Sequence, residues 1–240
     1  MNPARPPAHR VYFSDLAGVG PGADLVITGD EAGHAARAKR LRPGEPVALL
    51  DGRGLVADAE VLRTEAGKRA LLEVRLGAVR RVAPASPRVE VWCPPPKGDR
   101  LETMIDQLSQ AGATAWRPLR TARSERDAFR PDKLERVAIE AAKQCGRAWT
   151  LAIGDWADFG DAIADERAAL ADASGRPGGP GEGDIVLLIG PEGGWTPEEL
   201  AQAAGAGRPV VRFGPHAMRI ETAAVAGAAC LLTRAEGGTA

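Results

Sequence analysis

The sequence has few of the residues that form metal centres or disulfide frameworks. Its 240 residues include three histidines and three cysteines, and Cys93, Cys145 and Cys230 lie far apart. An odd, scattered set excludes a fully paired disulfide framework and offers no CxxC spacing for zinc. We therefore expect no protein-held metal, and reduced thiols of the kind typical of a cytoplasmic protein.

Long apolar runs are also missing. No stretch approaches the roughly 20 consecutive apolar residues that a membrane-spanning helix needs. The N-terminal "MNPARPPAHRVYF" has arginines and prolines but no apolar signal core, so nothing predicts export or a membrane partner. A chain of 240 residues with this composition suits one large globular domain or two small ones.

The net charge is only −1, but it is unevenly distributed along the chain. Residues 1–88 carry fourteen Lys and Arg against ten Asp and Glu, whereas residues 89–240 carry seventeen against twenty-two. A basic smaller part beside an acidic larger part fits a polyanion-binding module, but on its own ordinary scatter is the better explanation.

The first part of the chain has the pattern of a small β-barrel or sandwich. Four apolar segments predict short strands, at 24–28, 46–51, 55–63 and 69–80. The sequence "DGRG" at 51–54 predicts a hairpin turn. Between the first two strands, Asp30 can begin a helix that Pro43-Gly44 ends. That helix would display His34, Arg37, Lys39, Arg40 and Arg42, either to a polyanion or to solvent.

After a proline-containing polar stretch at 80–88, strands and helices alternate. Apolar segments predict strands at 89–93, 115–119, 150–154, 185–190 and 209–214. Helices are predicted at 97–112, 131–145, near 156–171, from Thr196 onward and at 219–235, and a glycine-rich surface loop at 173–184. In "TPEE", Thr196 is the predicted cap, followed by a proline and an acidic first turn. This alternation predicts an α/β domain with a mostly parallel sheet that is covered on both faces.

Two of these strands end in glycine- and proline-containing turns, "LLIGPEGGWTPEEL" and "FGPHAMR". Ligands of α/β sheets bind beyond the carboxyl ends of strands, where glycine lets the backbone approach them closely. Neither turn has the lysine that reaches a nucleotide phosphate, which disfavours a nucleotide hydrolase, and Glu192 favours a cationic or polyhydroxyl ligand. Either turn alone could be a tight connection with no ligand; the pair predicts a binding site.

The second turn leads into "MRIET", which places Arg219 at the start of the last helix. A cation there opposes the helix dipole, so it needs a carboxylate partner, a substrate anion or full solvation. Arg219 and Glu221 could therefore act on a substrate or pair with each other. The small residues of "TAAVAGAAC" fit either core packing or a subunit contact.

Four segments in this order resemble the RsmE family of SPOUT-class methyltransferases: "KGDRLETMIDQLSQAGATAWRPLRTARS", "AAKQCGR", "LLIGPEGGWTPEE" and "FGPHAMRIETAA". The stretch "HAARAKRLRPGEPVALLDGRG" resembles that family's N-terminal RNA-binding domain. The resemblance covers residues 9–235. Together GPEGG and the downstream RxET are specific, whereas GPEGG alone is shared among SPOUT relatives.

The resemblance implies a PUA-like β-barrel RNA-binding domain at 1–82 and a SPOUT methyltransferase domain at 88–240 with a deep C-terminal trefoil knot. It implies a homodimer that transfers a methyl group from S-adenosylmethionine (SAM) to N3 of a uridine in 16S ribosomal RNA of the small subunit. The implied SAM-binding residues are Leu188, Ile189, Gly190, Pro191, Glu192, Gly194, Arg212, Phe213, Gly214, Met218 and Arg219. The implied RNA-binding residues are His34, Arg37, Arg40, Arg42, Arg123 and Arg147.

Uracil N3 carries a proton and is a poor nucleophile until that proton leaves. Arg219 is the candidate for stabilising the resulting anion and Glu221 the candidate for handling the proton, and the sulfonium donor requires no metal. The chain departs from the family at Gln107 and Gln110, where relatives have charged residues, and at Lys143, where some have Glu. The alternatives are a SPOUT enzyme with another RNA target and a non-catalytic RNA-binding assembly factor.

Overall fold

The computed structural model describes residues 9–125 and 128–237; residues 1–8, 126–127 and 238–240 of the two predicted domains lie outside the described residues. The chain divides into two compact units. One contains residues 1–84 together with 142–150, and the other contains residues 85–141 and 151–240. The sequence did not indicate that the short segment 142–150 is part of the first unit.

The first unit is built on a five-stranded sheet in the order β1-β3-β4-β5-β2, in which β1 is parallel to β3 and the other pairs are antiparallel. Its elements are β1 (Arg10–Tyr12), β2 (Asp24–Thr28), α1 (Gly29–Arg37), β3 (Pro46–Leu50), β4 (Leu55–Glu65) and β5 (Leu71–Arg81). The predicted hairpin turn joins β3 to β4. Asp51 holds it, because its Oδ1 accepts hydrogen bonds from the backbone N–H groups of Arg53 (2.7 Å) and Leu55 (2.8 Å).

The predicted basic helix is shorter than expected. It ends at Arg37, so Arg40 and Arg42 lie in the turn that follows it. Arg40 has a left-handed backbone with φ +51°, which an α-helix cannot contain. The turn brings Leu41 into the core, where it is 3% exposed, and burial of that side chain outweighs the helical pattern.

The second unit is a parallel α/β domain, as predicted. Its strands are β6 (Val89–Cys93), β7 (Ala115–Arg120), β8 (Ala152–Ile153), β9 (Ala157–Asp158), β10 (Ala168–Pro177), β11 (Ile185–Ile189) and β12 (Val210–Arg212). They follow the order β12-β10-β11-β6-β7-β8, and β9 also pairs with β7. The helices are α2 (Arg100–Ala111), α3 (Pro131–Cys145), α4 (Phe159–Ala164), α5 (Pro197–Gly205) and α6 (Ile220–Gly237), and the last four residues of α3 are counted with the first unit.

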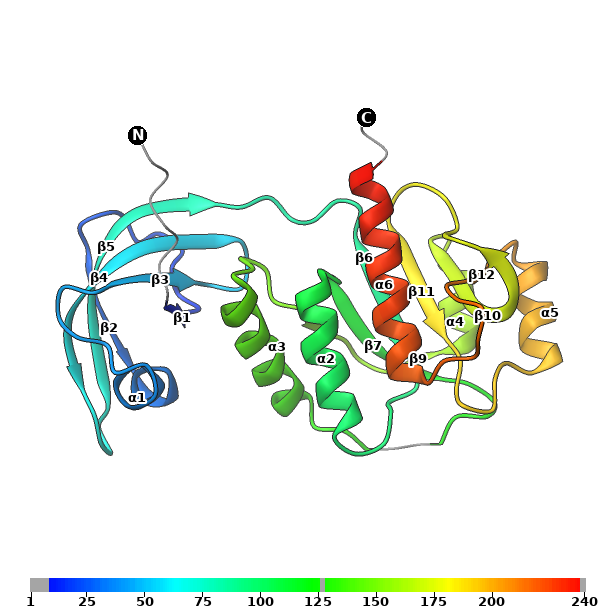
Figure 1. Cartoon of the computed structure of the whole chain (residues 1–240), viewed down its shortest axis with the longest axis horizontal. Helices are drawn as coiled ribbons and strands as arrows, with labels where there is room; N and C mark the ends of the chain where they lie inside the picture. Colours follow the sequence, from blue (N-terminus) through cyan, green and yellow to red (C-terminus); the bar gives the residue numbers. More distant parts are fainter. Residues whose placement is uncertain (1–8, 126–127, 238–240) are drawn as a thin grey trace. The chain divides into compact units, whose positions relative to one another are not determined.

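Helices cover both faces of this sheet, and the alternation of side chains along the strands shows which face each covers. In β11, Leu187 packs with α2, α3 and α6, whereas Val186 and Leu188 pack with α4 and α5. Helices α2 and α6 lie side by side on the first face (Figure 1). Because the neighbouring strands are parallel, their carboxyl ends share one edge of the sheet.

The helix predicted near 156–171 is confirmed only over Phe159–Ala164, and the surface loop predicted at 173–184 only from residue 178 onward. The chain there forms β9, the short α4 and then β10, which extends to Pro177. β10 pairs with β11 on one side and β12 on the other, with an irregularity between Ala171 and Arg176. At Gly175 a Cβ atom would lie 2.6 Å from the backbone of Val211, so glycine marks a close approach of two strands.

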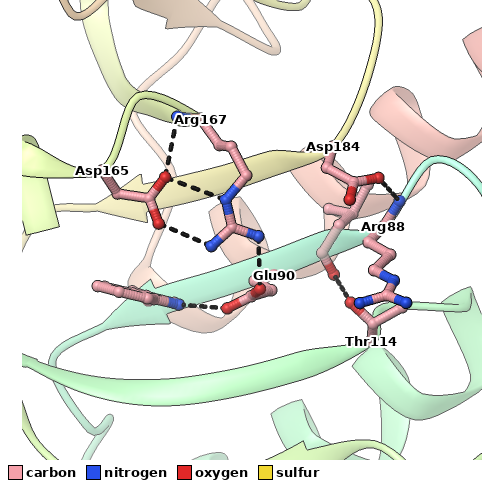
Figure 2. A network of polar contacts seen from close by, with 8 residues as sticks. Arg88, Glu90, Thr114, Asp165, Arg167 and Asp184 are labelled. Carbon is pink, nitrogen blue, oxygen red and sulfur yellow. Dashed lines mark hydrogen bonds and ion pairs between the residues drawn. The ribbon is translucent and has the colours of Figure 1, made fainter.

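A network of polar contacts ties the amino ends of three strands together (Figure 2). Arg167 lies just before β10 and donates to Asp165 (2.7 Å). It also donates to Glu90 of β6 (2.9 Å), and β6 is separated from β10 in the sheet by β11. The indole Nε1 of Trp92 also donates to Glu90, at 3.1 Å. Asp184 accepts from the backbone N–H of Arg88 at 2.8 Å. The Arg167 guanidinium holds the pKa of Asp165 below its usual value, chiefly through their side-chain hydrogen bonds.

Candidate functional site

The two glycine turns that the sequence singled out meet at the carboxyl edge of the second unit's sheet. With residues 171–173 in the middle of β10 they enclose a cavity of about 190 Å³. Nine of the eleven predicted cofactor residues line it: Ile189, Gly190, Pro191, Glu192, Gly194, Arg212, Phe213, Gly214 and Met218. Leu188 lies beneath the turn in the core, and Arg219 lines a different cavity. Asp172 and Ala173, which were not predicted, also border this first cavity.

Trp195 closes the first turn against β10. Its indole Nε1 donates to the carbonyl of Ala171 at 3.0 Å, and its side chain is 5% exposed. At Gly190 a Cβ atom would lie 3.0 Å from the Trp195 ring, so the turn has no room for a larger residue there. Gly194 has φ +68°, the left-handed conformation that favours glycine. The turn is therefore a fixed surface of backbone groups.

The start of α5 has the predicted cap in full. The Thr196 hydroxyl accepts from the Glu199 N–H at 3.1 Å, and Glu199 Oε2 accepts from the Thr196 N–H at 2.9 Å. Glu199 Oε1 also accepts from the N–H of Ala122 at 2.8 Å. This buried carboxylate therefore binds the loop after β7 to the glycine turn.

Arg123 makes a second connection between the same two loops. Its Nη1 donates to the carbonyls of Gly193 (2.7 Å) and Trp195 (3.4 Å). Arg123 was predicted to contact RNA, and its side chain is exposed beside the glycine turn.

A second cavity, of about 570 Å³, adjoins the first, because Pro191 and Glu192 border both. Its wall includes the loop between β6 and α2, the loop after β7 and the residue before α6. The charged side chains in this wall are Lys97, Arg100, Arg123, Arg219, Glu125 and Glu192. A group bound in the second cavity would lie next to one bound in the first.

Arg219 and Glu221 do not pair with each other, although the sequence left that open. Arg219 is exposed in the second cavity and, within the described part of the chain, its side chain makes no hydrogen bond or ion pair. Glu221 is 16% exposed, and its Oε1 lies 3.5 Å from Nη1 of Arg100. Its Oε2 is buried and has no hydrogen-bond partner in the part of the chain that the structure describes. Arg100 was missed, since no sequence signal connects it to Glu221.

Cys93, at the end of β6, is fully buried near this carboxylate. Burial first, and the Glu221 charge to a smaller extent, raise the pKa of its thiol to about 12. The Trp116 indole Nε1 lies 3.1 Å from the sulfur, which opposes that rise. Cys93 is therefore a protonated core residue and no nucleophile.

The predicted RNA-binding residues of the first unit lie on two segments. His34 and Arg37 are exposed in the last turn of α1, and Arg40 and Arg42 are exposed after it. Arg147 is half-buried in the segment 142–150, and desolvation lowers the pKa of its guanidinium.

Two of the family departures have local partners. Gln110 donates to Asp106 Oδ2 at 2.8 Å on the exposed side of α2, where Gln107 is also exposed. Lys143 is buried and forms an ion pair with Glu31 inside the first unit. A buried ammonium needs such a partner, so the Lys at this position is structurally accommodated.

Across residues 9–125 and 128–237, no cluster of three or more His, Cys, Asp or Glu has the arrangement of a metal site. In the same residues no helix is both long and apolar enough to cross a membrane.

The chain matches two family models, an RNA methyltransferase domain over residues 84–232 and an RNA methyltransferase PUA domain over residues 27–74. It is 36% identical to the ribosomal RNA small subunit methyltransferase E of Mycobacterium bovis, over 85% of this chain and 84% of that protein. The namesake from Synechocystis is 31% identical over 84% of this chain and 70% of its own.

Among solved structures, the chain is similar to a ribosomal RNA small subunit methyltransferase E from Neisseria gonorrhoeae bound to S-adenosyl methionine. The TM-score is 0.83 with 24% identity, over 94% of this chain and 97% of that one. This similarity shows that the two chains share a fold.

Proposed function

Because the chain belongs to the RsmE family of ribosomal RNA small subunit methyltransferases, we propose that it transfers a methyl group from SAM to N3 of a specific uridine in 16S ribosomal RNA. The observation that carries the proposal is the cavity of about 190 Å³ formed by the two glycine turns. A second cavity next to it, bordered by Pro191 and Glu192, is available to the acceptor.

The residues of the first cavity fit SAM. Backbone groups of both turns are available to hydrogen-bond an adenosine, and Ile189, Phe213 and Ile220 provide an apolar wall for its base. The carboxylates of Asp172 and Glu192 border the same space, which suits a sulfonium cation and disfavours a phosphate. When bound, SAM supplies an already activated methyl group.

The chain's own residues must bring N3 into line with that methyl group and stabilise the base once its proton leaves. Arg219 is exposed in the second cavity without a partner among the described residues, and we assign it the stabilisation of the uracil anion. The proton-handling role of Glu221 stays a prediction. Its carboxylate lines neither of the two cavities.

The wider features of the family extend the proposal. They are a PUA-like RNA-binding domain at 1–82, a SPOUT domain at 88–240 with a trefoil knot, a homodimer, the small ribosomal subunit as partner and a cytoplasmic location. The exposed side chains of His34, Arg37, Arg40 and Arg42 would contact phosphates of the RNA, with Arg147 as a further contact. Such contacts make RNA binding weaken as the salt concentration rises.

The experiment is to map N3-methylated uridines in 16S ribosomal RNA from cells with and without this gene. One uridine should lose its methyl group in the deletion strain and regain it when the purified enzyme and SAM are added to small subunits from that strain. An unchanged 16S map would overturn the proposal. A lost methyl group in transfer RNA would point to another RNA target, and absence of SAM binding would point to an assembly factor.

A further inference from the structure

The charges of the second cavity are unevenly satisfied. Lys97 Nζ lies 2.6 Å from Glu125 Oε2, and Arg123 is engaged with the carbonyls of Gly193 and Trp195. Arg219 has no side-chain partner among the described residues, and the guanidinium of Arg100 has a long contact to Glu221 and one hydrogen bond, to the carbonyl of Lys97. Two arginines are therefore available to a ligand in this cavity.

The contact between Arg100 and Glu221 is longer than a closed charge-assisted hydrogen bond. Nη1 lies 3.5 Å from Oε1, whereas such bonds are normally about 2.7–2.9 Å long. Nε of Arg100 donates to the carbonyl of Lys97 at 3.2 Å, which fixes the plane of the guanidinium. The side chain is 35% exposed, so donors remain for a group inside the cavity.

Glu221 is the carboxylate that this guanidinium contacts. Its side chain is 16% exposed, it borders neither cavity, and its buried Oε2 has no partner among the described residues. A carboxylate in that place contacts a side chain of the cavity wall without bordering the cavity itself.

Both arginines occupy positions where a helix alone disfavours a cation. Arg100 is the first residue of α2, and Arg219 immediately precedes α6. The N-terminal ends of helices carry partial positive charge, so an anion in the cavity would relieve the repulsion at both sites. A uridine that is losing its N3 proton presents two negative centres, the base and its flanking phosphodiester.

We propose that Arg100 binds a phosphodiester group of the RNA next to the methyl-accepting uridine, and that Glu221 is the positioning residue that holds Arg100 toward the second cavity. The inference rests on the proposed function. It assigns Arg100 to the phosphate and leaves Arg219 to the base. A planar guanidinium suits this task, since it can bind two phosphate oxygens at once. A second cavity of about 570 Å³, against about 190 Å³ for the first, accommodates more than the carboxylate tail of SAM.

The test compares Arg100→Ala, Arg100→Lys and Glu221→Gln with Arg136→Ala, an exposed arginine of α3 that borders neither cavity. Small subunits lacking the methyl group are the substrate. Arg100→Ala should raise KM for the subunit about tenfold and change kcat less than about threefold. It should also reduce the slope of log binding constant against log salt concentration by about 1. Arg136→Ala should match the wild type.

The lysine variant tests the geometry of the contact. Arg100→Lys should keep the salt slope, because it keeps the charge, and should recover only part of the lost affinity, because an ammonium is not a planar fork. Recovery to the wild-type KM would overturn bidentate binding by Arg100. A melting curve matching the wild type establishes that the alanine variant folds, and the lysine variant carries the test if it does not.

Glu221→Gln separates positioning from proton transfer. It should raise KM in the wild-type background, have no further effect in the Arg100→Ala background, and leave the pH profile of kcat unchanged. A fall in kcat with an altered pH profile that persists without Arg100 would make Glu221 the proton acceptor and overturn its positioning role.

Two further outcomes would overturn the role of Arg100. One is an unchanged KM in Arg100→Ala. The other is weaker SAM binding with unchanged RNA binding, which would assign Arg100 to the carboxylate of SAM. Filter binding of 16S ribosomal RNA requires no methyl transfer. An Arg100-dependent salt slope in an enzyme that fails to methylate the RNA would therefore refute the proposed function while upholding the phosphate contact.

Discussion

The two edges of the second unit's sheet differ in how their charged side chains are paired. At the amino edge, Arg167 donates hydrogen bonds to both Asp165 and Glu90, and the Trp92 indole donates another to the carboxylate of Glu90. At the carboxyl edge, Arg219 has no side-chain partner among the described residues and Glu221 keeps a buried oxygen without one. Paired charges hold strands in register, whereas groups left unpaired near a cavity are typical of a site that awaits a ligand.

The largest effect is expected from Arg219→Ala at the carboxyl edge. Loss of a cation that stabilises a developing anion should lower kcat on the order of 100-fold. The affinity for SAM should remain as in the wild type, because Arg219 does not line the first cavity. Single-turnover methylation and calorimetric SAM titration measure the two quantities. Unimpaired methylation would remove Arg219 from the chemistry.

A smaller effect is expected from Gly194→Ala in the glycine turn. Gly194 has φ +68°, and alanine there is strained, so the turn should shift and SAM should bind about tenfold more weakly. Gly207→Ala is a matched control, since Gly207 has φ +72° and equally open surroundings but does not border the cavity. Calorimetric titration of both variants with SAM compares them. Equal losses of affinity would show that strain alone, and not the site, is responsible.

Breaking the amino edge should affect stability and leave activity alone. Arg167→Ala removes the partner of two carboxylates and should lower the free energy of unfolding by about 1–2 kcal/mol. The side chain of Arg167 is 38% exposed, so the loss of free energy of unfolding should lie near the lower end of this range. Urea denaturation measures the change, and kcat per folded molecule should be unaltered. A fall in kcat would mean that the two edges are coupled.

The smallest effect is a pH dependence of that stabilisation. The folded-state pKa of Asp165 is lowered by its hydrogen bonds with Arg167, from an ordinary value of 3.8. An acid whose pKa is lower in the folded state stabilises the fold fully at pH values above its unfolded-state pKa. This stabilisation is lost as the pH falls through the folded-state pKa. The stability difference between wild type and Asp165→Asn should therefore shrink below about pH 4. Denaturation midpoints between pH 3 and 7 test this, and a difference that grows on acidification would contradict it.

The sequence predicted the parts of this fold that depend on local signals. The cap at Thr196 and the hairpin turn at 51–54 are both present. The predicted helix at 156–171 was too long, because its last residues belong to β10, which is defined by its neighbours β11 and β12, and a local pattern does not reveal them. Glycines at 173–178 indicated a loop, whereas at least Gly175 permits two backbones to touch.

The candidate site was predictable to the same extent. Two turns that each follow a strand were expected to share an edge, and they line one cavity. Arg100 was not predictable, because its relation to Glu221 arises only when α2 and α6 pack side by side. Contacts of this kind are non-local, and residue type alone does not identify them.

The carboxylate of Glu199 has a consequence for how the two substrates are handled. One oxygen accepts a hydrogen bond at the start of α5, beside the first glycine turn. The other accepts one from Ala122, in the loop that borders the second cavity. A substitution at Glu199 must therefore disturb both loops together. Mutations there should alter the affinities for methyl donor and RNA in parallel, so neither specificity can evolve at this residue independently of the other.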